Sequence, residues 1–91
     1  MTLVLYTSYI NVNVKKKTEK IAFQLNAIHR EFTEVDIASD KEAQAKLRQL
    51  TGSVVVPQLL CNDKLVGNYD ECWDLVEEGE FEEKIKSLAA Q

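Results

Sequence analysis

Residues 54–60 read Val-Val-Val-Pro-Gln-Leu-Leu, and this apolar run holds the only proline among the 91 residues. Proline cannot donate a hydrogen bond to a sheet ladder, so it belongs at the start, the edge or a bulge of a strand. The bond before a proline is also the one kind of peptide bond that adopts the cis form at modest cost. The run therefore predicts a strand that is interrupted at Pro57.

The composition is that of an ordinary globular protein. Hydrophobic residues make up 45% and charged residues 29% of the sequence, and the length predicts a single domain over residues 1–91. The net charge of −4 argues against general nucleic-acid binding, which needs a basic surface. No apolar run approaches the roughly 20 residues that cross a membrane. The first residues lack the basic start of a signal peptide, so a cytoplasmic protein is expected.

Hydrophobic periodicity divides the first half of the chain into strand, helix, strand and helix. Residues 2–6 and 32–37 fit short strands. Spacings of three and four between them predict a helix with one buried stripe, formed by Val14, Thr18, Ile21, Leu25 and Ile28. Ser39, followed three residues later by Glu42, predicts a capping box that opens a second helix, with Ala43, Leu47 and Leu50 on its apolar face.

The second half of the chain predicts a hairpin and two further helices. Residues 54–61 fit a third strand, Asn62-Asp63 a turn, and residues 64–66 a fourth strand that Gly67 ends. Asn68 and Glu71 predict the capping box of a third helix, and apolar residues at 81, 85 and 88 mark a fourth. The order β-α-β-α-β-β-α-α indicates an α/β fold, a four-stranded mixed sheet with helices on both faces.

Four short motifs follow one another in an order and at a spacing that resemble the glutaredoxin family. They are Tyr6-Thr7, Val35-Asp36-Ile37, Val-Pro-Gln-Leu-Leu at 56–60 and Gly-Asn-Tyr-Asp-Glu at 67–71. The resemblance spans nearly the whole chain. It implies the thioredoxin-like fold of glutaredoxin type, with a cis peptide bond between Val56 and Pro57.

The same resemblance implies a place for glutathione. In glutaredoxins, this ligand is held by the segment before the cis-proline and by the start of the helix after the hairpin. The corresponding residues here are Val56, Pro57, Asn68, Tyr69 and Asp70. A helix start offers free N–H groups to a carboxylate, and Asp70 can accept from an ammonium group. Against this, Tyr69 is bulkier than the family's usual residue, and Asp70 also suits a first helical turn. Retained glutathione binding is therefore an open alternative.

The sequence departs from the glutaredoxins where their chemistry takes place. These enzymes carry a cysteine between the first strand and the first helix, where the helix start lowers the pKa of a thiol. Residues 8–15 read Ser-Tyr-Ile-Asn-Val-Asn-Val-Lys and contain no cysteine. Cys61 and Cys72 lie in patterns that favour small buried side chains. We therefore predict no catalytic residue and no thiol–disulfide oxidoreductase activity.

A narrower branch of the family shares this loss of cysteines. The missing cysteines, the long first loop and the lysine-rich first helix resemble the SH3-domain-binding glutamic-acid-rich-like proteins, which implies a protein-interaction or modulatory role. An SH3 ligand of the P-x-x-P type needs two prolines, so that motif is absent here. Two cysteines and His29 supply too few ligands for a metal site, so none is predicted.

A candidate interaction patch lies at the start of the first helix, at Lys15, Lys16 and Lys17. Cations at this end of a helix oppose its dipole by about 0.3–1 kcal/mol each, which an acidic partner would relieve. The alternative is that these lysines are simply solvated.

These observations favour a non-catalytic adaptor or modulatory module that binds an unidentified protein and needs no cofactor. The alternatives are a glutathione-binding sensor and a glutathione-dependent oxidoreductase of glutaredoxin type.

Overall fold

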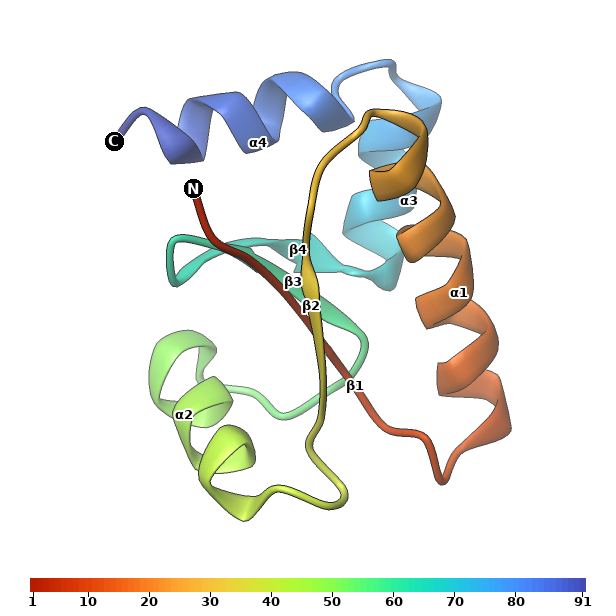
Figure 1. Cartoon of the computed structure of the whole chain (residues 1–91), viewed down its shortest axis with the longest axis vertical. Helices are drawn as coiled ribbons and strands as arrows, with labels where there is room; N and C mark the ends of the chain where they lie inside the picture. Colours follow the sequence, from red (N-terminus) through yellow and green to blue (C-terminus); the bar gives the residue numbers. More distant parts are fainter.

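The computed structural model describes all 91 residues and contains the eight elements in the predicted order (Figure 1). They are β1 (Leu3–Thr7), α1 (Val12–Ala27), β2 (Thr33–Asp36), α2 (Lys41–Thr51), β3 (Gln58–Cys61), β4 (Lys64–Asn68), α3 (Tyr69–Glu77) and α4 (Phe81–Ala89). None of the helices is both long and apolar enough to span a membrane.

The four strands form one mixed sheet in the order β2-β1-β3-β4. β1 pairs with β2 in parallel and with β3 in antiparallel, and β3 pairs with β4 in antiparallel. The mixed four-stranded sheet is therefore confirmed. The predicted third strand is too long, because β3 begins only at Gln58. The Val56–Pro57 bond is cis as expected, and Pro57 ends the irregular segment that leads into β3.

Helices cover both faces of the sheet (Figure 1). On one face, Ile21 and Leu25 of α1 join buried residues of α3 and α4 in the larger core cluster. On the other, Leu47 of α2 packs with Tyr6 and Leu60 in a smaller cluster. Because side chains alternate along β3, Leu59 and Cys61 belong to the first cluster and Leu60 to the second.

Two further predicted element boundaries are wrong. The N-cap of α2 is Asp40, whose side chain accepts a hydrogen bond from the Ala43 N–H at 3.0 Å, and Ser39 makes no such bond. An aspartate directly before the first helical residue competes with the serine for the same role and binds the free N–H group. Gly67 does not end the fourth strand, since it pairs with Leu59 inside β4.

Close packing between β4 and α3 explains why a glycine occupies position 67. A Cβ atom added there would lie 2.7 Å from Cβ of Glu71 and 3.3 Å from the backbone nitrogen of Cys72. The first turn of α3 therefore folds back against β4 at a distance that only glycine permits. The hairpin turn is confirmed, with Asn62 and Asp63 both at positive φ.

Candidate functional site

The first helix starts at an asparagine. The side chain of Asn11 caps α1 by accepting hydrogen bonds from the N–H groups of Asn13 and Val14, at 2.9 and 3.1 Å. These are the donors that the start of a helix otherwise presents to an anion. The loop before it is anchored to β2, because Tyr9 donates its hydroxyl hydrogen to Glu34 at 3.0 Å. Burial, with this hydrogen bond, raises the pKa of Tyr9.

A shallow groove of about 330 Å³ lies beside this loop, and we call it the loop groove. It is lined by Ser8, Ile10, Asn11, Val14, Ile37, Ala38, Gln44 and Val56. The β1–α1 loop thus faces the residue before the cis-proline across the groove. Ile10 in the β1–α1 loop, Val12 at the start of α1 and Val55 beside Val56 are strongly exposed, so apolar side chains are accessible near the groove. No hydrogen bond in the structure joins the Ser8 hydroxyl to a base that could activate it.

Neither cysteine reaches the surface. Cys61 and Cys72 are free thiols that are 0% and 1% exposed, as predicted from their patterns. Burial, assisted by the charge of Glu71, raises the pKa of Cys72 to about 12, and burial also raises the pKa of Cys61. Each sulfur lies within hydrogen-bonding distance of a backbone carbonyl, Cys61 of Ile85 and Cys72 of Gly67. Thiols of this kind are structural rather than reactive.

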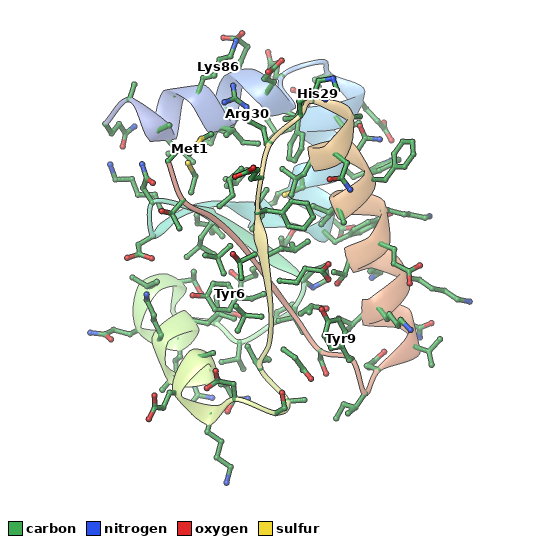
Figure 2. All side chains as sticks on the ribbon, viewed as in Figure 1. Met1, Tyr6, Tyr9, His29, Arg30 and Lys86 are labelled. Carbon is green, nitrogen blue, oxygen red and sulfur yellow. The ribbon has the colours of Figure 1, made fainter.

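The connection between α1 and β2 lies at the far end of the molecule. His29 and Arg30 lie at the opposite end of the sheet from Tyr9 (Figure 2). His29 follows Ile28, the C-cap of α1, in a left-handed conformation and is exposed, as expected of a residue just after a helix C-terminus. Arg30 Nη2 lies 3.5 Å from Glu82 Oε2 and so ties this connection to α4. No group of three or more His, Cys, Asp or Glu side chains is placed to hold a metal ion.

Comparison with known proteins identifies the family. The glutaredoxin family model matches residues 9–66, which is more than half of the chain. The sequence is 31% identical over 71 residues to Monothiol glutaredoxin-S17 of Arabidopsis thaliana. The chain belongs to the glutaredoxin family. The match covers 78% of this chain and only 14% of that relative.

Solved structures show the same glutaredoxin fold. The C. albicans actin interacting protein Aip5 has a TM-score of 0.80 at 22% identity, over 92% of this chain and 87% of that one. A buckwheat glutaredoxin–glutathione complex has a TM-score of 0.72 at 16% identity, over 97% of this chain and 79% of that one. Both likenesses therefore support the thioredoxin-like architecture predicted from the sequence.

The five residues predicted to hold glutathione in a glutaredoxin fall into two groups. Val56 lines the loop groove beside the buried Pro57. Asn68 is the β4 partner of Gln58, so it lies next to the segment that follows Pro57. The side chain of Asn68 is occupied in the predicted capping box, accepting from Glu71 N–H at 2.9 Å while Glu71 accepts from Asn68 N–H at 3.0 Å.

The other two residues that the resemblance predicts to hold glutathione, Tyr69 and Asp70, differ in their surroundings. Asp70 is exposed and takes part in none of the three salt bridges of the structure. Tyr69 is stacked on Trp73, with ring centroids 6.0 Å apart and an angle of 16° between the planes. The helix start itself still offers the N–H groups of Tyr69 and Asp70, which have no partner inside α3. Two backbone N–H groups are therefore available at this helix start, while the Tyr69 ring is engaged with Trp73.

The structure brings one residue of the predicted lysine patch to Tyr69. The Nζ atom of Lys17 lies over the Tyr69 ring, 5.3 Å from its centroid. Lys16 instead lines a second groove of about 500 Å³ between α1 and α3, which we call the helix groove. Its lining residues are Lys16, Glu19, Lys20, Phe23, Gln24 and Trp73. Lys16 and Lys17 of the predicted patch therefore have different neighbours, the helix groove and the Tyr69 ring.

Phe23 was missed by the sequence reasoning, although it is 69% exposed on α1. The signal was present, because Phe23 falls outside the stripe that predicts the buried face of this helix. What the sequence did not reveal is its neighbour, since Trp73 comes from a helix that begins more than forty residues later.

Proposed function

We propose that this chain is a non-catalytic glutaredoxin-like module that binds another protein. The observation that carries the proposal is that the start of α1 holds Asn11 as its cap and no thiol, while both cysteines are buried. A glutaredoxin needs a thiolate at that helix start, and Asn11 supplies an amide that does not act as a nucleophile.

Two further observations support a binding role. The apolar side chains of Ile10, Val12 and Val55 stay exposed around the loop groove, where a catalytic glutaredoxin meets its substrate. Exposed apolar clusters of this kind mark surfaces that other molecules cover. Proteins of the same fold carry names that describe protein interaction, such as the actin interacting protein Aip5 of C. albicans. The narrower resemblance to the SH3-domain-binding glutamic-acid-rich-like proteins has the same implication, and free buried thiols suit a cytoplasmic location.

A glutathione-coupled assay tests the proposal. The wild-type chain is incubated with glutathione, glutathione reductase, NADPH and a small disulfide, next to an active glutaredoxin as the positive control. We expect no turnover above the rate without protein. Turnover that disappears when Cys61 or Cys72 is replaced by serine would overturn the proposal and restore the oxidoreductase alternative.

Glutathione binding without catalysis is a second candidate. It is favoured by the loop groove beside Val56 and by the free helix start at Tyr69 and Asp70. Titration with glutathione, followed by amide chemical shifts, separates the two candidates. Shifts confined to Val56, Tyr69 and Asp70 support a sensor, and unchanged spectra at millimolar glutathione exclude it.

A further inference from the structure

The helix groove combines an aromatic floor with a cationic edge. α1 and α3 run side by side (Figure 1), and the groove between them has a volume of about 500 Å³. Phe23 from α1 is largely exposed, and Trp73 from α3 is half-buried. A side chain of matching size would therefore cover apolar surface that water contacts in the free protein.

The lysines of α1 have no anionic partner within the chain. Lys15, Lys16, Lys17 and Lys20 take part in none of the three salt bridges. The first turn of α1 contains no acidic residue, so nothing there balances these cations near the positive end of the helix dipole. Glu19 is the one acidic residue that lines the groove, against two lysines. An anionic ligand is therefore complementary to the edge of the groove.

Trp73, one of the two aromatic residues of the groove, is held in place before any partner arrives. The Trp73 ring stacks on the Tyr69 ring, and Lys17 in turn lies over the Tyr69 ring. A ring that is fixed by such contacts loses little conformational freedom when a ligand covers it. Rigid aromatic side chains of this kind are the usual anchors of protein interfaces.

We propose that the helix groove binds an acidic peptide segment that carries a bulky apolar side chain. The apolar side chain lies between Phe23 and Trp73, and carboxylates of the peptide pair with Lys16 and Lys20 on the groove edge. This inference names a partner for the protein-interaction role proposed above and rests on that role. Peptide binding and thiol-transferase turnover are separate measurements, so either can fail without the other.

The charges around the groove favour a peptide over an anionic membrane. Asp70 and Asp74 of α3 are exposed, and the whole chain has a net charge of −4. A flat anionic surface that reached Lys16 and Lys20 would also meet these carboxylates. A narrow peptide in the groove need not approach Asp70 and Asp74, since the carboxylates of the peptide would face Lys16 and Lys20 on the α1 side.

Trp73 is the only tryptophan of the chain, so its fluorescence reports directly on the groove. The probe is a short synthetic peptide in which leucine alternates with glutamate. One control peptide has alanine in place of each leucine, and a second has lysine in place of each glutamate. We expect saturable quenching or a spectral shift of Trp73 with the first peptide alone, weakened by added salt.

Two variants of the full chain test the assigned contacts. Replacing both edge lysines, Lys16→Glu with Lys20→Glu, should weaken binding by about tenfold or more, and Phe23→Ala should do the same. The matched control is Lys41→Glu on α2, an exposed lysine away from the groove, which should leave the affinity unchanged. All of these positions are exposed, so the variants should fold, and circular dichroism checks this.

Three results would overturn the inference. The first is equal binding of the glutamate–leucine peptide by wild type and the double lysine variant. The second is a Trp73 response to phosphatidylserine vesicles with none to the peptide, which would indicate a membrane surface. The third is a Trp73 signal that depends on protein concentration without any peptide, which would assign the groove to a second copy of the chain.

Discussion

The ammonium group of Lys17 lies over the ring of Tyr69, 5.3 Å from its centroid. This contact joins the lysine-rich start of α1 to the start of α3, and it covers one face of an aromatic residue that the resemblance to glutaredoxins predicts to border glutathione. A cation on a ring face of this kind stabilises a protein by about 0.5–1 kcal/mol at exposed sites.

The contribution of this contact can be measured with Lys17→Met, which keeps the aliphatic stem and a similar helix propensity. Removing any cation near a helix start also relieves the dipole, so Lys16→Met serves as the control for that effect. We expect Lys17→Met to be less stable than Lys16→Met by about 0.5–1 kcal/mol in urea unfolding. Equal stabilities would mean that the ring contact contributes nothing.

A thiol at position 11 should acquire the reactivity that the wild-type chain lacks. In Asn11→Cys, the N–H groups of Asn13 and Val14 donate to the sulfur in place of the amide oxygen, so the thiol pKa should drop below its ordinary value of about 8.5. The pH dependence of iodoacetamide labelling, followed by mass spectrometry, measures this pKa. Ala45→Cys, on the exposed side of α2, provides the ordinary thiol, and identical profiles for the two variants would refute the prediction.

The buried thiol of Cys72 should make the protein less stable in alkali. Its pKa is raised to about 12 in the folded state, so below the unfolded-state pKa of about 8.5 both states hold the proton and the stabilisation is complete. Between these values only the unfolded chain releases the proton, and the free energy of unfolding should fall by about 1.4 kcal/mol per pH unit from this group. Urea unfolding of wild type and Cys72→Ala isolates the slope, which should be shallower in the variant by this amount.

Gly67→Ala should destabilise the junction of β4 and α3 by about 1–3 kcal/mol, because the added methyl group meets the backbone of the first helical turn. Near-ultraviolet circular dichroism should also report a disturbed Tyr69–Trp73 pair. The comparison is Gly52→Ala, where φ is 76° and no atom lies within 4 Å of the added carbon. That variant should lose stability through its backbone alone and keep the aromatic signal.

The cap of α2 gives a matched pair of substitutions. Asp40→Ala removes the acceptor of the Ala43 N–H group and should cost about 1 kcal/mol. Ser39→Ala removes only a hydroxyl that donates to the Asp36 carbonyl at 3.3 Å, so it should change stability by less than about 0.5 kcal/mol. Thermal or urea unfolding of the two variants measures the two losses of stability. A larger loss for Ser39→Ala than for Asp40→Ala would mean that Ser39 is the cap.

Local signals in the sequence predicted the features that depend on neighbouring residues. The capping box of Asn68 and Glu71 and the turn at Asn62-Asp63 are fixed by a few consecutive residues, and the structure confirms both. Ser39 and Asp40 are adjacent candidates for one cap, and only the conformation of the chain decides between them. The cis bond at Pro57 was expected from the family resemblance rather than from propensity, which favours trans.

The candidate sites depend on contacts between distant segments, which the sequence pattern does not contain. The sequence pattern assigns no role to Asn11, and its role as a cap is clear only from the start of α1 at Val12. Lys17 and Tyr69 are more than fifty residues apart, and so are Lys16 and Trp73. Periodicity showed which face of each helix is buried, but the rotation of α1 against α3 decides which exposed side chains meet.

The complete burial of Cys61 and Cys72 has a practical consequence for studies of this chain in solution. A cysteine introduced anywhere on the surface becomes the single site that a maleimide or spin label can reach, so no native residue has to be removed first. Pairs of labels at the ends of α1 and α2 can then report on movement between the two faces of the sheet in an otherwise unaltered protein.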